Sequence, residues 1–139
     1  MFYQAFIGCK NLLSAADFSD FRIANDQTFR QTYNGCYSLT DAGAMSISTL
    51  NGTLNFNNMY TACSNLTGIQ GLELPALTIP YGAYAGMFEN CSSLSSTPVI
   101  NAAEISANGM VGMFSGTAIT DAAQVSGVAI GVQAFRAMY

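Results

Sequence analysis

The stretch Tyr84-Ala85-Gly86-Met87-Phe88-Glu89-Asn90-Cys91-Ser92-Ser93-Leu94 occurs, in altered form, four times in this chain of 139 residues. Each copy has an aromatic residue three positions before a cysteine, a leucine three positions after it, and a second aromatic four positions before the first. The triplets are Phe6, Cys9 and Leu12; Tyr33, Cys36 and Leu39; Tyr60, Cys63 and Leu66; and Phe88, Cys91 and Leu94. Such self-similarity, with a period of about 27 residues, is typical of repeat architectures.

Two more apolar columns follow each triplet, at six and eleven positions after the leucine. They contain Phe18, Met45, Leu72, Ile100 and Val125, and then Ile23, Leu50, Leu77, Ile105 and Ile130. A fifth copy keeps this frame with Met110, Phe114 and Thr117, and Ile119 takes the place of the leucine one residue early. Most variation in length falls after the last column, which predicts a surface loop there. Because one unit cannot bury its apolar face alone, we expect the units to stack into coils that share a core.

The spacing within each unit predicts its local structure. Aromatic residues four positions apart, with a cysteine three further on, lie on one face of a short helix. Four of the five residues directly before the cysteine column tolerate the left-handed conformation that ends a helix; the five are Gly8, Gly35, Ala62, Asn90 and Gly116. The segment that begins at each leucine is then expected to be extended and to form one rung of a parallel sheet.

The segment Met87–Pro98 resembles the Met-Phe-x-x-Cys-x-x-Leu signature of the BspA-like leucine-rich repeats. The resemblance implies an α/β fold: a right-handed solenoid with a parallel sheet on one face and short helices and loops on the other. We therefore expect a single repeat domain over residues 1–139, with about five coils of about 25–28 residues. The coils would begin near Phe2, Phe29, Phe56, Tyr84 and Met110, with an incomplete sixth from Phe135.

The composition argues against several classes of function. Four Lys and Arg stand against eight Asp and Glu, which gives a net charge of −4 and no basic patch for nucleic acid. The chain has no histidine, so the commonest general base and the commonest zinc ligand are missing. No stretch is apolar enough to span a membrane. We expect no enzymatic activity, no cofactor, no metal and no membrane insertion.

Four groups of polar or reactive residues have an ordinary structural interpretation. The cysteines lie a full coil apart, which predicts buried free thiols rather than a zinc site or disulfides. Asp17, Asp20, Asp26 and Asp41 lack the spacing of a calcium loop and are interpreted as solvated surface. The glycosylation sequons are interpreted as chance matches in a chain rich in Asn, Ser and Thr. The aromatic columns leave three tyrosines as candidates for the surface: Tyr3, Tyr37 and Tyr81.

The repeats in the BspA-like family occur on surface proteins, where their usual roles are adhesion and protein contact. The sequence therefore predicts a non-enzymatic structural or adhesive protein at the cell surface or outside the cell. The alternative is a subunit of an extracellular filament or phage fibre built by end-to-end stacking; binding of glycans or other small ligands is a third possibility. No polar terminal repeat caps the array, so we expect a piece of a longer array or a polymerising unit. Contact with a protein partner or another copy is expected at the ends, through Phe2, Phe6, Val125, Ile130, Phe135 and Tyr139.

Overall fold

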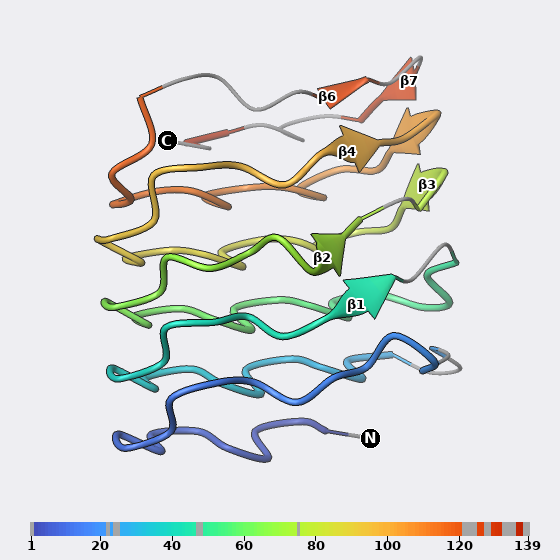
Figure 1. Ribbon diagram of the computed structural model, residues 1–139. Helices are drawn as coiled ribbons and strands as arrows, with labels where there is room; N and C mark the ends of the chain where they lie inside the picture. Colours follow the sequence, from blue (N-terminus) through green and yellow to red (C-terminus); the bar gives the residue numbers. More distant parts are fainter. Residues whose placement is uncertain are drawn as a thin grey trace.

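The computed structural model describes residues 2–21, 23, 26–46, 49–74, 76–120, 125–126, 129–131 and 136–137. The chain winds through successive coils that lie one above another (Figure 1). We number these coils 1 to 5 by the residue that opens each of them: Phe2, Phe29, Phe56, Tyr84 and Met110. Each coil has a turn half, from the opening residue to the cysteine column, and an extended half, which begins at the leucine column.

The extended halves contain short strands, each of two residues. They are β1 (Met45–Ser46), β2 (Leu72–Glu73), β3 (Thr78–Ile79), β4 (Ile100–Asn101), β5 (Glu104–Ile105), β6 (Val125–Ser126) and β7 (Ala129–Ile130). All pairings between them are parallel and join successive coils: β1 with β2, β4 with β6, and β5 with both β3 and β7. The strands therefore form three small sheets of two, three and two strands.

The predicted α/β leucine-rich-repeat-like solenoid is wrong. Residues 2–21, 23, 26–46, 49–74, 76–120 and the shorter described segments contain no helix. Separate small sheets take the place of one parallel sheet along a face. The reason lies in the backbone of the turn halves, which is incompatible with a right-handed helix.

In the turn halves and the two residues that precede each of them, one residue in four has a positive φ. These residues are Gln4 and Gly8; Gln27, Gln31 and Gly35; Leu54, Asn58 and Ala62; Gly82, Gly86 and Asn90; and Asn108, Gly112 and Gly116. A right-handed helix needs a negative φ at every residue. The left-handed conformation predicted before the cysteine column is confirmed, with φ between 60° and 74°. Its inferred role is wrong, because each such residue is the third of a four-residue turn and ends no helix.

Peptide N–H groups in the turn halves alternate between two kinds of acceptor. Cys9 N–H donates within its own turn, to the carbonyl of Phe6 at 3.1 Å. The N–H groups of Gln4 and Phe6 instead donate to the next coil, at the carbonyls of Arg30 and Thr32, over 3.0 and 2.9 Å. This alternation pairs the backbone in the absence of a helix.

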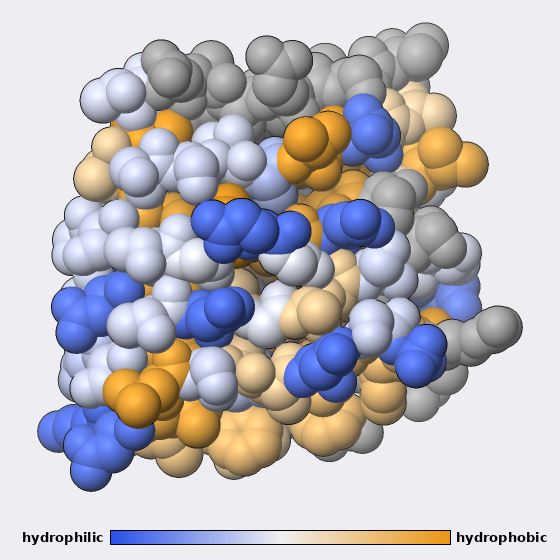
Figure 2. Space-filling model, viewed as in Figure 1, coloured by the Kyte–Doolittle hydropathy of each residue, from blue (hydrophilic) through white to orange (hydrophobic). Residues whose placement is uncertain are grey.

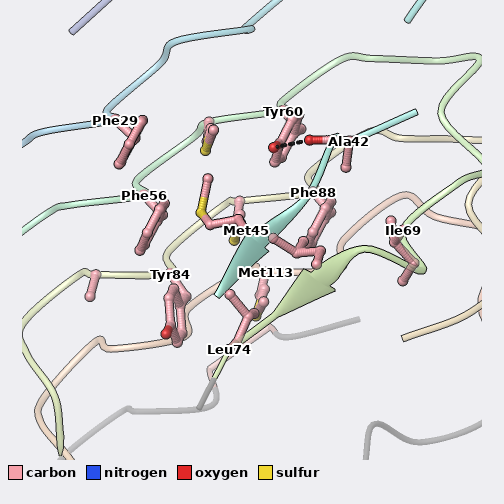
Figure 3. Close-up of a cluster of buried hydrophobic side chains, with 14 of the residues drawn as sticks. Phe29, Ala42, Met45, Phe56, Tyr60, Ile69, Leu74, Tyr84, Phe88 and Met113 are labelled. Atoms are coloured by element: carbon pink, nitrogen blue, oxygen red, sulfur yellow. Dashed lines mark hydrogen bonds between the residues drawn. The ribbon is translucent and has the colours of Figure 1, made fainter. Parts of the chain in front are cut away.

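The predicted aromatic column of Phe6, Tyr33, Tyr60, Phe88 and Phe114 is confirmed. Successive rings lie 5.3, 5.6, 5.5 and 5.7 Å apart and within 7° of parallel. All are buried except Phe6, which is partly buried. The opening residues form a second column, in which Figure 3 shows Phe29, Phe56 and Tyr84 one below another. Together the two columns form the centre of the core.

The third coil departs from the predicted columns in its extended half. Leu77 was expected to be a core residue but is 68% exposed. Its place beside Ile105 is taken by Ile79, which is fully buried. The pairing shifts by two residues because Leu72 pairs back with Met45, whereas Leu74 bridges forward to Ile100. Coil 3 is therefore longer by two residues within its extended half, and the prediction that most length variation follows the last column is wrong.

Candidate contact surfaces

Coil 1 exposes aromatic side chains that are buried in the other coils. Phe2 stacks on Phe29 at 5.5 Å and Phe6 on Tyr33 at 5.3 Å. Phe29 and Tyr33 are at most 1% exposed, whereas Phe2 and Phe6 are only partly buried. Hydrophobic side chains line the lower edge of the molecule in Figure 2, where coil 1 lies. We call Phe2, Phe6 and the backbone carbonyls of residues 3, 5 and 7 the first-coil surface.

The first-coil surface carries a row of backbone acceptors. In coil 2 the carbonyls of Arg30, Thr32 and Asn34 accept bonds from the N–H groups of coil 1. Their equivalents in coil 1 are the carbonyls of Tyr3, Ala5 and Ile7, and these accept no bond from the part of the chain that the structure describes. A polypeptide that approached this surface would need N–H donors on alternate residues.

The structure gives only part of the predicted end contacts. Phe2 and Phe6 lie together on the first-coil surface. Val125 and Ile130 stand in β6 and β7, where their backbones pair with Ile100 and Ile105 of coil 4. The side chains of Val125 and Ile130 lie outside what is described, as do the whole of Phe135 and Tyr139. The sequence did not predict the row of acceptors, because every residue has a backbone carbonyl and the sequence does not show which of them lack a donor.

Burial of the cysteine column is confirmed for three residues and wrong for one. Cys36, Cys63 and Cys91 are fully buried, and their thiols donate to carbonyls of the preceding coil at 3.1, 3.1 and 3.0 Å. Burial raises the pKa of the Cys91 thiol to about 12 and that of Cys63 still further. Cys9 is exposed because, among the described residues, no coil lies against its outer side; all four thiols are free.

Two of the four aspartates that lack the spacing of a calcium loop accept hydrogen bonds within local turns, and Asp26 accepts one from the Thr53 N–H of the next coil. Asp17 accepts a bond from the N–H of Ser19 at 2.8 Å, and its hydrogen bonds with Ser19 lower the pKa of the carboxyl. Asp41 accepts one from the N–H of Gly43, also at 2.8 Å. Among the residues that the structure describes, no three acidic or cysteine side chains are placed to hold a metal ion together. The same residues include no helix long and apolar enough to cross a bilayer.

The three tyrosines predicted for the surface are exposed. Tyr3 is 41% exposed and has the Arg30 guanidinium 5.7 Å from its ring centre. Tyr37 is 46% exposed and has the Lys10 ammonium at 6.0 Å. Both contacts join coil 1 to coil 2, so these rings help to hold the first coil in place. Tyr81 is 50% exposed, and its hydroxyl accepts a long bond of 3.5 Å from an Asn108 amide.

A groove of about 480 Å³ opens between the extended halves of coils 3 and 4. We call it the coil 3–4 groove. Strongly hydrophilic and hydrophobic surfaces adjoin around β2 and β4 on the face drawn in Figure 2. The groove is lined on one side by Ile69, Gln70, Leu72, Glu73 and Leu74, and on the other by Ser96, Thr97, Pro98, Val99 and Asn101. Sequence reasoning missed it, although the alternating apolar residues Leu72 and Leu74 were a signal of the two extra residues.

Comparison of the chain with models of protein families, with curated proteins and with solved structures gave no match.

Proposed function

We propose that this chain is a non-enzymatic structural or adhesive repeat protein that holds another polypeptide against its first-coil surface. The observation that carries the proposal is the difference between coil 1 and coil 2. Equivalent aromatic rings are partly exposed in one and fully buried in the other. The backbone carbonyls of Tyr3, Ala5 and Ile7 in coil 1 lack a described donor, whereas the equivalent carbonyls of coil 2 accept hydrogen bonds.

Burial of this surface would be favourable for two physical reasons. Each large apolar side chain that leaves water contributes roughly 1.5–3 kcal/mol before entropy is counted. Unpaired backbone groups at an open edge are a template for association with another chain. The partner would place an aromatic or apolar side chain over Phe6 and N–H groups over the carbonyls of Tyr3, Ala5 and Ile7.

A non-catalytic role is supported by the state of the reactive side chains. The chain has no histidine. Desolvation raises the pKa values of the buried Cys63 and Cys91 thiols and of the Tyr60 and Tyr84 hydroxyls, so these groups stay neutral near pH 7. Reactive thiolates need an electropositive, partly exposed site, which is the opposite environment.

A filament subunit is the second candidate, and the direction of the hydrogen bonds between turn halves favours it. The N–H groups of each turn half donate to the following coil, and its carbonyls accept from the preceding one. Two first-coil surfaces would set acceptors against acceptors, so a twofold contact is disfavoured. A second copy would instead approach head to tail, which gives an open-ended assembly. Location at a cell surface or outside the cell remains part of the proposal for both candidates.

The proposal is tested with a synthetic peptide that repeats residues 28–39 and with the protein itself. Because every turn half donates forward, this peptide laid outside coil 1 would supply the missing donors. We expect it to bind the wild-type protein and the Leu77→Glu control, and not Phe6→Glu. Leu77 is exposed on coil 3, away from the first-coil surface. Light scattering and electron microscopy of concentrated protein test for a second copy. If neither the peptide nor a second copy binds, the proposal fails.

A further inference from the structure

The coil 3–4 groove lies where the hydrogen bonds between coils are interrupted. Between coils 1 and 2, Ala15 N–H donates to the Asp41 carbonyl at 3.0 Å; between coils 2 and 3, Ala42 N–H donates to Gly68 at 2.9 Å. The next bond in this series would run from Ile69 to Ser96, and it is not formed between these two described residues. The pairing resumes only at Leu74 and Ile100, after the shift of two residues.

The interruption leaves backbone donors unpaired on both walls. Within the described residues, the N–H groups of Ile69 and Gln70 on coil 3 donate no hydrogen bond, nor do those of Ser96 and Thr97 on coil 4. An extended peptide offers carbonyl acceptors at intervals along its length, and such strand-like addition is a common mode of peptide recognition. The backbone chemistry of the groove therefore suits a peptide.

The groove also carries a fixed negative charge. Glu73 Oε2 accepts a hydrogen bond from the Ser46 hydroxyl at 2.7 Å, which orients the carboxylate. Its Oε1 accepts no bond from the described residues. The lining includes no Lys or Arg, and the chain as a whole has a net charge of −4. A positively charged side chain would meet both a local partner and a favourable overall field.

The floor of the groove is apolar. Leu72, Leu74 and Pro98 are buried there, whereas Val99 beside them is 62% exposed. The volume of about 480 Å³ lies within the range of pockets that hold small ligands. An occupant with an apolar side chain next to a basic one would cover this floor and reach Glu73.

From this combination we infer that the coil 3–4 groove binds an extended peptide segment, with a basic side chain of the peptide at Glu73. The occupant is a protein partner, and its backbone carbonyls meet the unpaired N–H groups of the two walls. This site is separate from the first-coil surface and stands whether or not that surface binds a partner.

The test uses three fluorescein-labelled pentapeptides that differ only at the centre: Ala-Val-Arg-Val-Ala, and the same peptide with Gln or Glu in place of Arg. Fluorescence polarisation on the whole protein should show the Arg peptide binding about fivefold more tightly than the Gln peptide, as for one exposed ion pair. The Glu peptide should bind most weakly. Glu73→Gln should abolish the preference for Arg, and Glu104→Gln should keep it. Glu104 is exposed on β5, outside the lining of the groove.

A second variant tests the groove itself, independently of the charge on Glu73. Thr97→Trp fills the groove and should remove binding of both the Arg and the Gln peptides, with an unchanged thermal midpoint as the check of folding. Equal binding of the Arg and Gln peptides to the wild type, or an Arg preference that survives in Glu73→Gln, would overturn the inference. Displacement of the Arg peptide by a neutral oligosaccharide but not by excess Gln peptide would identify a saccharide site, and would overturn it too.

Discussion

The same substitution, Tyr to Phe, should have opposite effects on stability in neighbouring coils. In coil 3 the Tyr60 hydroxyl donates to the Ala42 carbonyl at 2.7 Å, and both residues are buried (Figure 3). Tyr60→Phe keeps the ring between Tyr33 and Phe88 but leaves that carbonyl without a described donor. A buried polar group left unpaired costs about 1–3 kcal/mol, so we expect a loss of this size.

Tyr84 is the matched case in coil 4. Its side chain is fully buried, and its hydroxyl has no hydrogen-bond partner among the described residues. Phe29 and Phe56 occupy the same column, so a phenylalanine ring fits there. Tyr84→Phe removes an unpaired hydroxyl at the loss of a few packing contacts. We expect a change between zero and about 1 kcal/mol in favour of the folded state.

Urea unfolding of the wild type and both variants measures the difference directly. With an unchanged slope, a shift of the midpoint reports stability alone. Thermal midpoints should move by about 4 °C for each 1 kcal/mol in a chain of this size. Equal destabilisation by the two variants would refute the reasoning, because it would show that the ring environment, and not the pairing of the hydroxyl, sets the effect.

Three further predictions concern thiols, pH and glycines. Cys9 should react quickly with a thiol reagent in the native protein while the other three cysteines react only on unfolding; rapid labelling of all four would contradict their burial. Burial raises the folded-state pKa of Cys91 from 9.0 to about 12. Stability should therefore be intact below pH 9 and fall between pH 9 and 12, with a loss of about 1.4 kcal/mol at pH 10 from Cys91 alone. Urea midpoints across this range check it, and Cys91→Ser should flatten the slope. Gly43→Ala should destabilise more than Gly8→Ala: both have positive φ, but a Cβ at Gly43 meets the Ala16 carbonyl at 2.5 Å and one at Gly8 meets nothing within 4 Å. Equal losses in thermal midpoint would contradict the role of this close approach.

The aromatic columns could be predicted from the sequence because their offsets are identical in successive copies. The helix was a wrong interpretation of the same spacing, since positions four apart also recur in a chain of four-residue turns. The contrary signal was present at Gly82, Gly86 and Asn90, where residues that tolerate a positive φ recur every four positions. A helix would not place them there.

The errors in coil 3 and at the surfaces have a different origin. Leu77 was assigned to the core by counting eleven positions from Leu66, which assumes that every extended half has the same length. The first-coil acceptors depend on which way the peptide groups point, and side chains do not encode that direction. The coil 3–4 groove arises where hydrogen bonds between the coils are not formed. The regular spacing of the apolar columns does not show where such a bond is missing.

The shift of two residues in coil 3 has a consequence for how such a chain can change its length. In β2 the buried Leu72 is followed by the exposed Glu73 and then by the buried Leu74, so one more inward–outward pair fits without disturbing the rest. A single inserted residue would turn every later side chain of that half to the opposite face. Insertions and deletions in the extended halves should therefore survive as even numbers of residues, and each even insertion creates a new gap against the neighbouring coil. Length variation in this fold is thus a way to generate new grooves while the core stays intact.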